Sequence, residues 1–169
     1  MFENPRDYPD LLTLQDGWQR LRDEVLPVLF AAREMRDERA EDGGWFVLPL
    51  MVEPEDRGVF TDAAIRLSRG YVPELCARMD RLSDVQAYAL SVVEPGAEIK
   101  THTHGNPFAS ASICLAGGTG AYLEVEGERH HFSDGSMAVF DYRRPHTVVN
   151  QGPEARVCLI VAVPLAGAG

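Results

Sequence analysis

Short β-rich runs, separated by turn residues at nearly even intervals, fill the sequence from Asp84 onward. Gly, Pro, Asn and Asp mark the breaks between them, as is typical of tight turns. Eight strands of this kind, with no helical period among them, predict a mainly β fold, a sandwich or barrel. The expected strands are Val85–Val93, Glu98–His104, Ser110–Leu115, Ala121–Val125, Glu128–Phe132, Met137–Phe140, His146–Val149 and Arg156–Val163.

The first part of the sequence has a different period. Residues 11–32 carry apolar side chains at spacings of three and four residues, which predicts an amphipathic helix. We expect Thr13 to be its N-cap, and Pro27 to kink or end the helix near Leu26.

Two further elements are expected before the β-rich half. Trp45–Val52 has the composition of a strand, and Pro49 within it favours the edge of a sheet. Pro73–Arg81 has the pattern of a short helix. The chain is therefore predicted to be one domain, in which a helical cover (residues 1–82) packs on a jelly roll (residues 83–165).

Charge and cysteine content narrow the classes of partner. The formal net charge of −10 repels phosphate backbones and anionic lipids, so we expect neither nucleic acid nor membrane as partner. A small-molecule substrate and a homodimer are compatible with this composition. The polar start of the chain does not resemble a secretory signal, and three widely spaced cysteines do not suggest a disulfide framework. A cytoplasmic location is expected.

Three histidines are candidates for a metal site. His102 and His104 are two residues apart on one predicted strand, so both side chains would project from the same face, and His146 begins a later strand. Imidazoles that converge in the mouth of a barrel bind divalent metals and leave coordination positions open. The alternative is that the pair faces solvent. His130 and His131 point to opposite faces, and a structural role is expected for both.

The residues around these histidines resemble the two cupin motifs. Pro95-Gly96 precedes His102-Thr-His104, and Gly135-Ser136 precedes Pro145-His146 with an apolar strand between them. The glutamate that a cupin places four or five residues after the second histidine is missing, because Phe108 and Ala109 occupy those positions. The resemblance therefore implies a cupin-like metal geometry without its usual fourth ligand.

A closer resemblance is to the aspartyl/asparaginyl β-hydroxylase family of iron(II)/2-oxoglutarate dioxygenases. It is carried by the segments LSVVEPGAEIKTH, GAYLEVEGERHHFSDGSMAVFDYRRPH and TVVNQGPEARVCLIVAV, within Leu90–Val163, and by the N-terminal segment LQDGWQRLRDEV. This resemblance implies a double-stranded β-helix that uses Fe(II), O2 and 2-oxoglutarate. The expected reaction converts 2-oxoglutarate to succinate and CO2 while an amino acid, an amino-acid residue or a related small metabolite is hydroxylated.

The resemblance also assigns roles to residues. His102 and His146 would be the iron ligands, Arg156 would hold the distal carboxylate of 2-oxoglutarate, and Ser91 would add a hydrogen bond to it. Arginine suits this role because its guanidinium is permanently charged and binds carboxylates through two nitrogens. Alternatively, Arg156 lies at the exposed start of its strand or pairs with a nearby acid.

This chain departs from the family at two places. His104 stands where the wider fold carries the carboxylate ligand, so it would complete a three-histidine site or act near the metal without binding it. No Arg or His occurs from Gly105 to Ala121, where relatives place such groups, so the substrate class stays open. Asp141 would either orient an imidazole or cap the turn before Arg143.

Two rival functions remain at this point. The first is a cupin-type enzyme that uses His102, His104 and His146 without 2-oxoglutarate. The second is a metal-binding module of the same fold without turnover. The orientation of Arg156 separates the first rival from the dioxygenase, because only the dioxygenase requires this side chain to point at the metal from inside the barrel.

Overall fold

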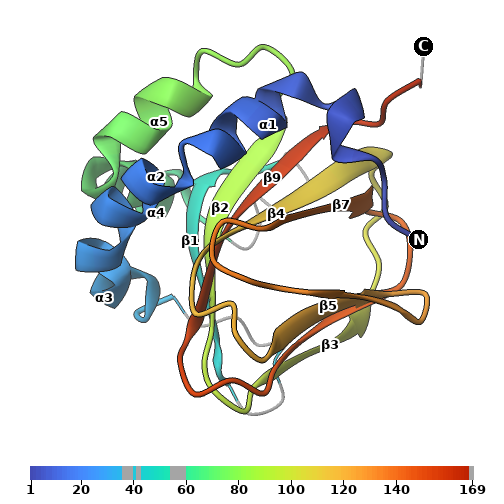
Figure 1. The fold of residues 1–169 in the computed structure, drawn as a ribbon. Coiled ribbons are helices and arrows are strands. Elements are labelled where there is room, and N and C mark those ends of the chain that lie inside the picture. Colours follow the sequence, from blue (N-terminus) through green and yellow to red (C-terminus); the bar gives the residue numbers. More distant parts are fainter. Residues whose placement is uncertain (36–39, 41–42, 54–59, 168–169) are drawn as a thin grey trace.

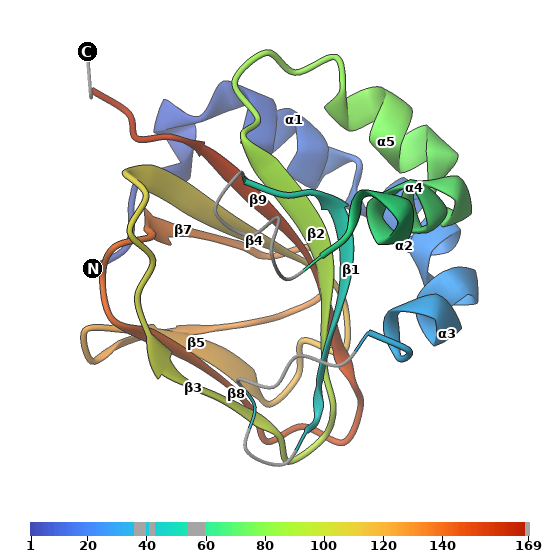
Figure 2. The ribbon, with the colours of Figure 1, turned by 180° about the vertical axis from the view of Figure 1, so that it is seen from behind.

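Two antiparallel β-sheets face each other, and helices cover the outer face of the larger one (Figures 1 and 2). The computed structural model describes residues 1–35, 40, 43–53 and 60–167. The five-stranded sheet contains, in spatial order, β1 (Trp45–Met51), β2 (Ala87–Val93), β9 (Arg156–Pro164), β4 (Phe108–Ala116) and β7 (Met137–Asp141). The four-stranded sheet contains β3 (Glu98–His102), β8 (His146–Asn150), β5 (Ala121–Val125) and β6 (Glu128–His131).

The strand order identifies the fold. From β2 onward the chain passes repeatedly between the sheets, so that β9 lies between β2 and β4 in one sheet and β8 lies between β3 and β5 in the other. This arrangement is the double-stranded β-helix, or jelly roll, and it confirms the predicted fold class. Each of the eight predicted strands is present with ends within two residues of the expected ones. β1 lies at the edge of its sheet, as Pro49 predicts.

The N-terminal helix is more broken than the sequence predicts. Residues 11–32 belong to α1 (Pro9–Asp16), α2 (Trp18–Val25), the 3-10 turn η2 (Leu26–Val28) and α3 (Leu29–Ala32), after a 3-10 turn η1 (Pro5–Asp7). The expected kink at Pro27 is present as η2. Thr13 as N-cap is wrong, because α1 starts four residues earlier and the Thr13 hydroxyl donates to the carbonyl of Pro9 within the helix.

Two helices follow β1 in the sequence. The predicted helix at Pro73–Arg81 is α5 (Pro73–Met79), whereas α4 (Asp62–Tyr71) was not expected. The signal for α4 is Thr61, whose side chain accepts a hydrogen bond from the backbone of Ala64 and so caps the helix.

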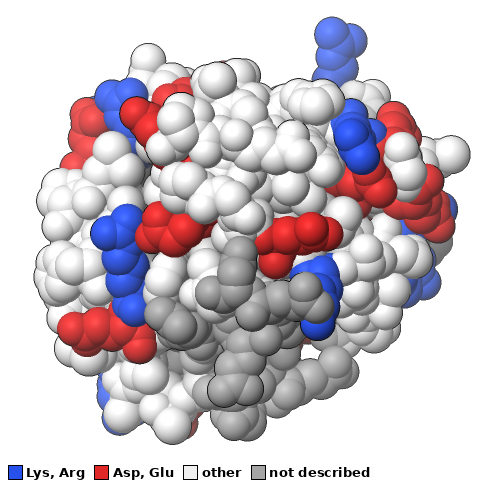
Figure 3. Space-filling view, turned by 90° about the horizontal axis from the view of Figure 1, so that it is seen from below, with Lys and Arg blue, Asp and Glu red and all other residues white. Residues whose placement is uncertain are grey.

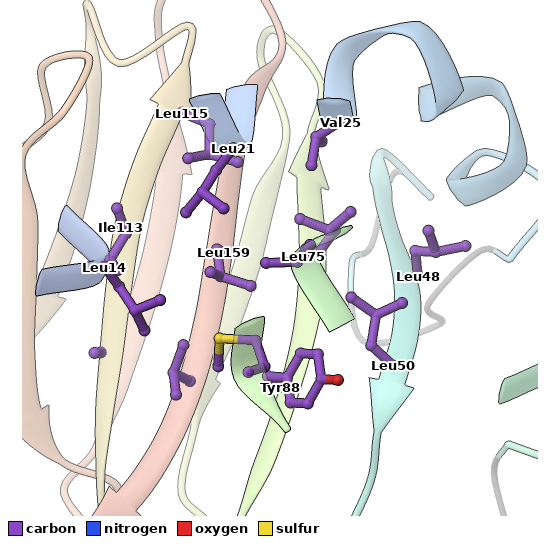
Figure 4. Packing of buried hydrophobic residues seen from close by; sticks show 14 of the residues in the cluster. Leu14, Leu21, Val25, Leu48, Leu50, Leu75, Tyr88, Ile113, Leu115 and Leu159 are labelled. Carbon is purple, nitrogen blue, oxygen red and sulfur yellow. The ribbon is translucent and has the colours of Figure 1, made fainter. Parts of the chain in front are cut away.

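Strand alternation divides the buried residues into two cores. On β4, Ala109, Ala111, Ile113 and Leu115 face the helices, whereas Ser110, Ser112 and Cys114 face the other sheet. Figure 4 shows Leu14 and Leu21 of the helices packed over Ile113, Leu115 and Leu159 of the sheet. The helices therefore seal the outer face of the larger sheet, and the space between the sheets is left for a pocket.

The surface carries charges of both signs. On the face shown in Figure 3, basic side chains lie interspersed with acidic ones. Cys76, Cys114 and Cys158 are buried free thiols. Among the described residues, no helix is long and apolar enough to cross a membrane.

Candidate metal centre and anion pocket

His102 and His146 are cross-strand partners on β3 and β8. Their ring centroids lie 4.3 Å apart. The Nδ1 atom of His102 lies 2.8 Å from the carbonyl oxygen of Lys100, and Nδ1 of His146 lies 2.8 Å from that of Arg144. Because a carbonyl oxygen only accepts, Nδ1 carries the proton in both rings, and Nε2 carries the lone pair that a metal requires.

His104 joins this pair from the loop that follows β3. The strand was predicted to reach His104, but β3 ends at His102, so the expectation that both histidines share one strand face is wrong. The loop is held by a hydrogen bond of 3.2 Å from the backbone N–H of His104 to the carbonyl of Tyr142. The imidazole stacks on the Tyr142 ring, with centroids 3.6 Å apart and an angle of 10° between the planes.

The three imidazoles fit a divalent metal ion. One ligand nitrogen from each of His102, His104 and His146 lies within 4.8 Å of the others. Imidazole nitrogens bind Zn²⁺ at about 2.0–2.1 Å, so two ligands of one ion lie at most about 4.2 Å apart, which is comparable with the separations found here. Neutral nitrogen donors of this kind suit iron, zinc, copper or nickel.

Arg156 lies at the first position of β9, and its side chain points into the space between the sheets. Its neighbours Val157 and Leu159 pack on the helix side, so alternation directs Arg156, Cys158 and Ile160 inward. Arg156 is only 1% exposed. Its Nη2 donates to the hydroxyl of Ser91 at 3.3 Å, and its guanidinium lies 5.0 Å from the centroid of the Phe132 ring.

Two nitrogens of the Arg156 guanidinium have no hydrogen-bond partner among the described residues. They are Nε and Nη1, and both are buried. An unpartnered buried donor carries its full desolvation cost, and a buried cation without a counter-ion costs more. The geometry therefore provides a site for an anion beside Arg156 and Ser91.

A single pocket connects the anion site to the histidines. Its lining includes Ser91, Arg156, His102, His104 and His146. The remaining walls are largely apolar, with two serines on β4 and one carboxylate. They comprise Trp45, Val47, Pro49, Met51, Val52, Glu53, Phe60, Ala87, Tyr88, Ala89, Ile99, Ser110, Ser112, Leu123, Phe140, Tyr142, Val148, Ile160 and Ala162.

Other residues considered from the sequence lie outside this arrangement. Asp141 caps the turn before Arg143, accepting from its backbone N–H and from its side chain, and these bonds hold the pKa of Asp141 below its usual value. Arg144 forms an ion pair with Glu126. His130 packs between Phe2 and Phe132.

Sequence reasoning did not identify two side-chain contacts in the pocket. The indole N–H of Trp45 donates to Ser91 at 2.9 Å. Tyr142, four residues before His146, supports the ring of His104. The sequence signal for Tyr142 is an aromatic residue four positions before a predicted ligand. Trp45 has no such signal, because the pairing of β1 with β2 brings it to Ser91.

Comparison with known proteins gives one family and several structures of a similar fold. The sequence model described as aspartyl/asparaginyl beta-hydroxylase matches residues 15–164. Among curated proteins, no sequence matches this chain significantly.

Three of the similar solved structures are a cupin domain, a predicted decarboxylase and a protein with a double-stranded β-helix domain. A Cupin_2 domain of an XRE family transcriptional regulator from Enterobacter cloacae is 11% identical, with a TM-score of 0.48 over 72% of this chain and 98% of that chain. A predicted oxalate decarboxylase from Thermotoga maritima is 19% identical (TM-score 0.43; 53% and 73% covered). A conserved protein with a double-stranded beta-helix domain from Klebsiella pneumoniae is 23% identical (TM-score 0.41; 52% and 73% covered).

Proposed function

The chain belongs to the aspartyl/asparaginyl β-hydroxylase family, and on this premise we propose that it is an iron(II)- and 2-oxoglutarate-dependent dioxygenase. Its substrate would be an amino acid, an amino-acid residue or a related small metabolite, which it hydroxylates. The observation that carries this proposal is the buried guanidinium of Arg156, two of whose nitrogens lack an acceptor, in the pocket that also holds the three imidazoles.

The charge of Arg156 supports a dicarboxylate as co-substrate. At 1% exposure the guanidinium is removed from water, and no acidic side chain of the described part of the chain pairs with it. Neither alternative considered from the sequence, an exposed position or an acidic partner, fits this environment. A ligand carboxylate would satisfy Nε and Nη1 with charge-assisted hydrogen bonds. The second carboxylate and the 2-oxo group of the same ligand would extend toward the histidines.

The protein's own residues would position the reactants. His102 and His146 would hold the metal through Nε2, with their rings oriented by the carbonyl oxygens of Lys100 and Arg144. Bound iron(II) would supply the oxidation of 2-oxoglutarate and substrate by O2. The largely apolar walls of the pocket would limit the access of water to the reacting groups.

A three-histidine metalloenzyme that does not use 2-oxoglutarate is the second candidate. The position of His104, whose ligand nitrogen lies within 4.8 Å of those of the other two histidines, favours it. A function without 2-oxoglutarate gives no role to the buried guanidinium of Arg156, which needs an anion as partner. The dioxygenase therefore accounts for more of the pocket.

Binding of 2-oxoglutarate in the absence of oxygen tests the proposal. The iron(II)-loaded protein should develop the visible charge-transfer band of the iron–2-oxoglutarate chelate. Arg156→Ala should require at least about tenfold more 2-oxoglutarate for half of the band, because the lost bonds involve charged groups. Arg129→Ala is the matched control, since Arg129 is an exposed arginine paired with Glu124. The absence of a band in the wild-type protein would favour the second candidate.

A further inference from the structure

We propose that Trp45 is a positioning residue for the co-substrate: its indole N–H turns the hydroxyl proton of Ser91 toward the carboxylate that Arg156 binds. This inference rests on the proposed function, and it concerns a residue that does not itself touch the carboxylate. It is carried by the two hydrogen bonds that meet at Ser91.

The hydroxyl of Ser91 accepts two hydrogen bonds in a buried position. One comes from Nε1 of Trp45 at 2.9 Å and one from Nη2 of Arg156 at 3.3 Å. A serine hydroxyl has two acceptor sites and one donor. Because both donors are N–H groups that cannot accept in return, the two acceptor sites are used, and the O–H proton points away from both nitrogens.

Strand pairing fixes this arrangement. Trp45 on β1 pairs with Val93 on β2, and Val93 pairs with Arg156 on β9. Trp45 and Arg156 therefore lie on either side of β2 at the same level. Two strand spacings place their backbones about 10 Å apart. Ser91 lies two residues from Val93 on the same face of β2, within reach of both side chains. Its remaining direction is into the pocket that it lines.

The resulting set of donors defines the ligand chemistry. Nε and Nη1 of Arg156 and the O–H of Ser91 all require acceptors, which suits a carboxylate and disfavours an ammonium group. Without the indole N–H, one acceptor site of Ser91 is vacated and its proton is free to rotate away. Trp45→Phe should therefore weaken carboxylate binding while the ring still fills its place.

Calorimetry with two probes on the Zn²⁺-loaded protein tests the inference. 2-Oxoglutarate carries the distal carboxylate, and 2-oxobutyrate shares the 2-oxo acid end but lacks that carboxylate. Trp45→Phe should weaken 2-oxoglutarate binding by about three- to tenfold, as expected for one hydrogen bond, and leave 2-oxobutyrate binding unchanged. In a Ser91→Ala background, Trp45→Phe should have no further effect. Equal losses for both probes, or additive losses with Ser91→Ala, would overturn the inference.

A second measurement follows the indole directly. The chain has two tryptophans, so ¹H–¹⁵N spectra contain two indole signals, and Trp18→Phe on α2 identifies the other one. The Trp45 signal should shift on addition of 2-oxoglutarate to the Zn²⁺-loaded protein and should shift much less with 2-oxobutyrate. Equal shifts with both probes would contradict the inference.

The controls separate the two proposals. If wild-type protein binds 2-oxoglutarate no more tightly than 2-oxobutyrate, the proposed function fails, and the inference fails with it. If wild type prefers 2-oxoglutarate and Trp45→Phe keeps that preference in full, only the role of Trp45 is wrong.

Discussion

His102 and His146 stand directly opposite each other on antiparallel strands, although β4 to β7 separate them in the sequence. A register shift between Ile99 and His102 interrupts the ladder just before this pair. The two rings therefore meet at the end of the β3–β8 pairing, where the strands separate toward the loop that carries His104. The metal centre is thus expected to be rigid on one side and adjustable on the other.

Metal affinity should reflect this difference. We expect His102→Ala and His146→Ala to lower the affinity for Fe(II) or Zn²⁺ by at least about 100-fold, because each removes a proposed ligand held by a strand. His104→Ala should lower it by about tenfold, within the range for groups that support a metal site. Competition with a chromogenic chelator measures all three, and His131→Ala on β6 is the control. Equal losses for the three histidines would make His104 a full ligand.

Acid sensitivity should depend in part on His130. Burial lowers its pKa below the usual value of about 6.5, and the charge of the neighbouring His131 lowers it further. Below pH about 6.5, His130 takes up a proton in the unfolded chain but stays neutral in the folded chain. The free energy of unfolding therefore falls as the pH decreases from about 6.5 toward the lowered pKa of the folded state. Nε2 of His130 is buried without a partner among the described residues.

Replacement of this histidine provides the test. His130→Phe should lose less stability than the wild type between pH 7.5 and pH 5.5, measured by urea unfolding of the metal-free proteins. The measurement without metal removes the contribution of metal binding to the pH dependence. The same loss in both proteins would mean that His130 does not contribute.

A glycine next to the anion site should be sensitive to substitution. Gly117, just after β4, has φ of +68°, and a Cβ atom there would lie 2.0 Å from the carbonyl oxygen of Ala155, the residue before Arg156. Gly117→Ala should therefore destabilise the fold by about 2–3 kcal/mol. It should also weaken 2-oxoglutarate binding, because the start of β9 must move.

Gly70 is the matched control. It lies in α4, and a Cβ atom there would meet no other atom within 4 Å. Gly70→Ala should stabilise the protein by about 0.5–1 kcal/mol, since glycine is unfavourable inside a helix. Denaturant unfolding measures the free energy of unfolding of both variants. A similar change in the two would contradict the claim that the close contact between Gly117 and Ala155 requires glycine.

The strands were predictable because their signals are local. Turn residues at short intervals mark the ends of β2 to β9, and Pro49 marks β1 as an edge. The inward direction of Arg156 depends on alternation along β9, which follows once the neighbouring apolar residues are known to face the helices. The N-terminal helix was predicted as one element, although its start at Pro9 and its break at Gly17 coincide with residues that locally favour a helix start and a helix end.

The connections within the site were not predictable from the sequence. Pairing of β1 with β2 brings Trp45 to Ser91, and pairing of β2 with β9 brings Ser91 to Arg156. Neither pairing has a signature in the residues themselves. The chain after His102 likewise leaves the strand before His104, so a spacing of two did not place both rings on one strand face.

A crystal structure of the protein with Mn²⁺ and 2-oxoglutarate tests the central claim most directly. We predict that the metal binds Nε2 of His102 and His146. The distal carboxylate should lie about 2.7–2.9 Å from nitrogens of Arg156, with the Ser91 hydroxyl donating to it. A 2-oxoglutarate molecule bound away from Arg156, or a metal ion bound without these two histidines, would contradict the account.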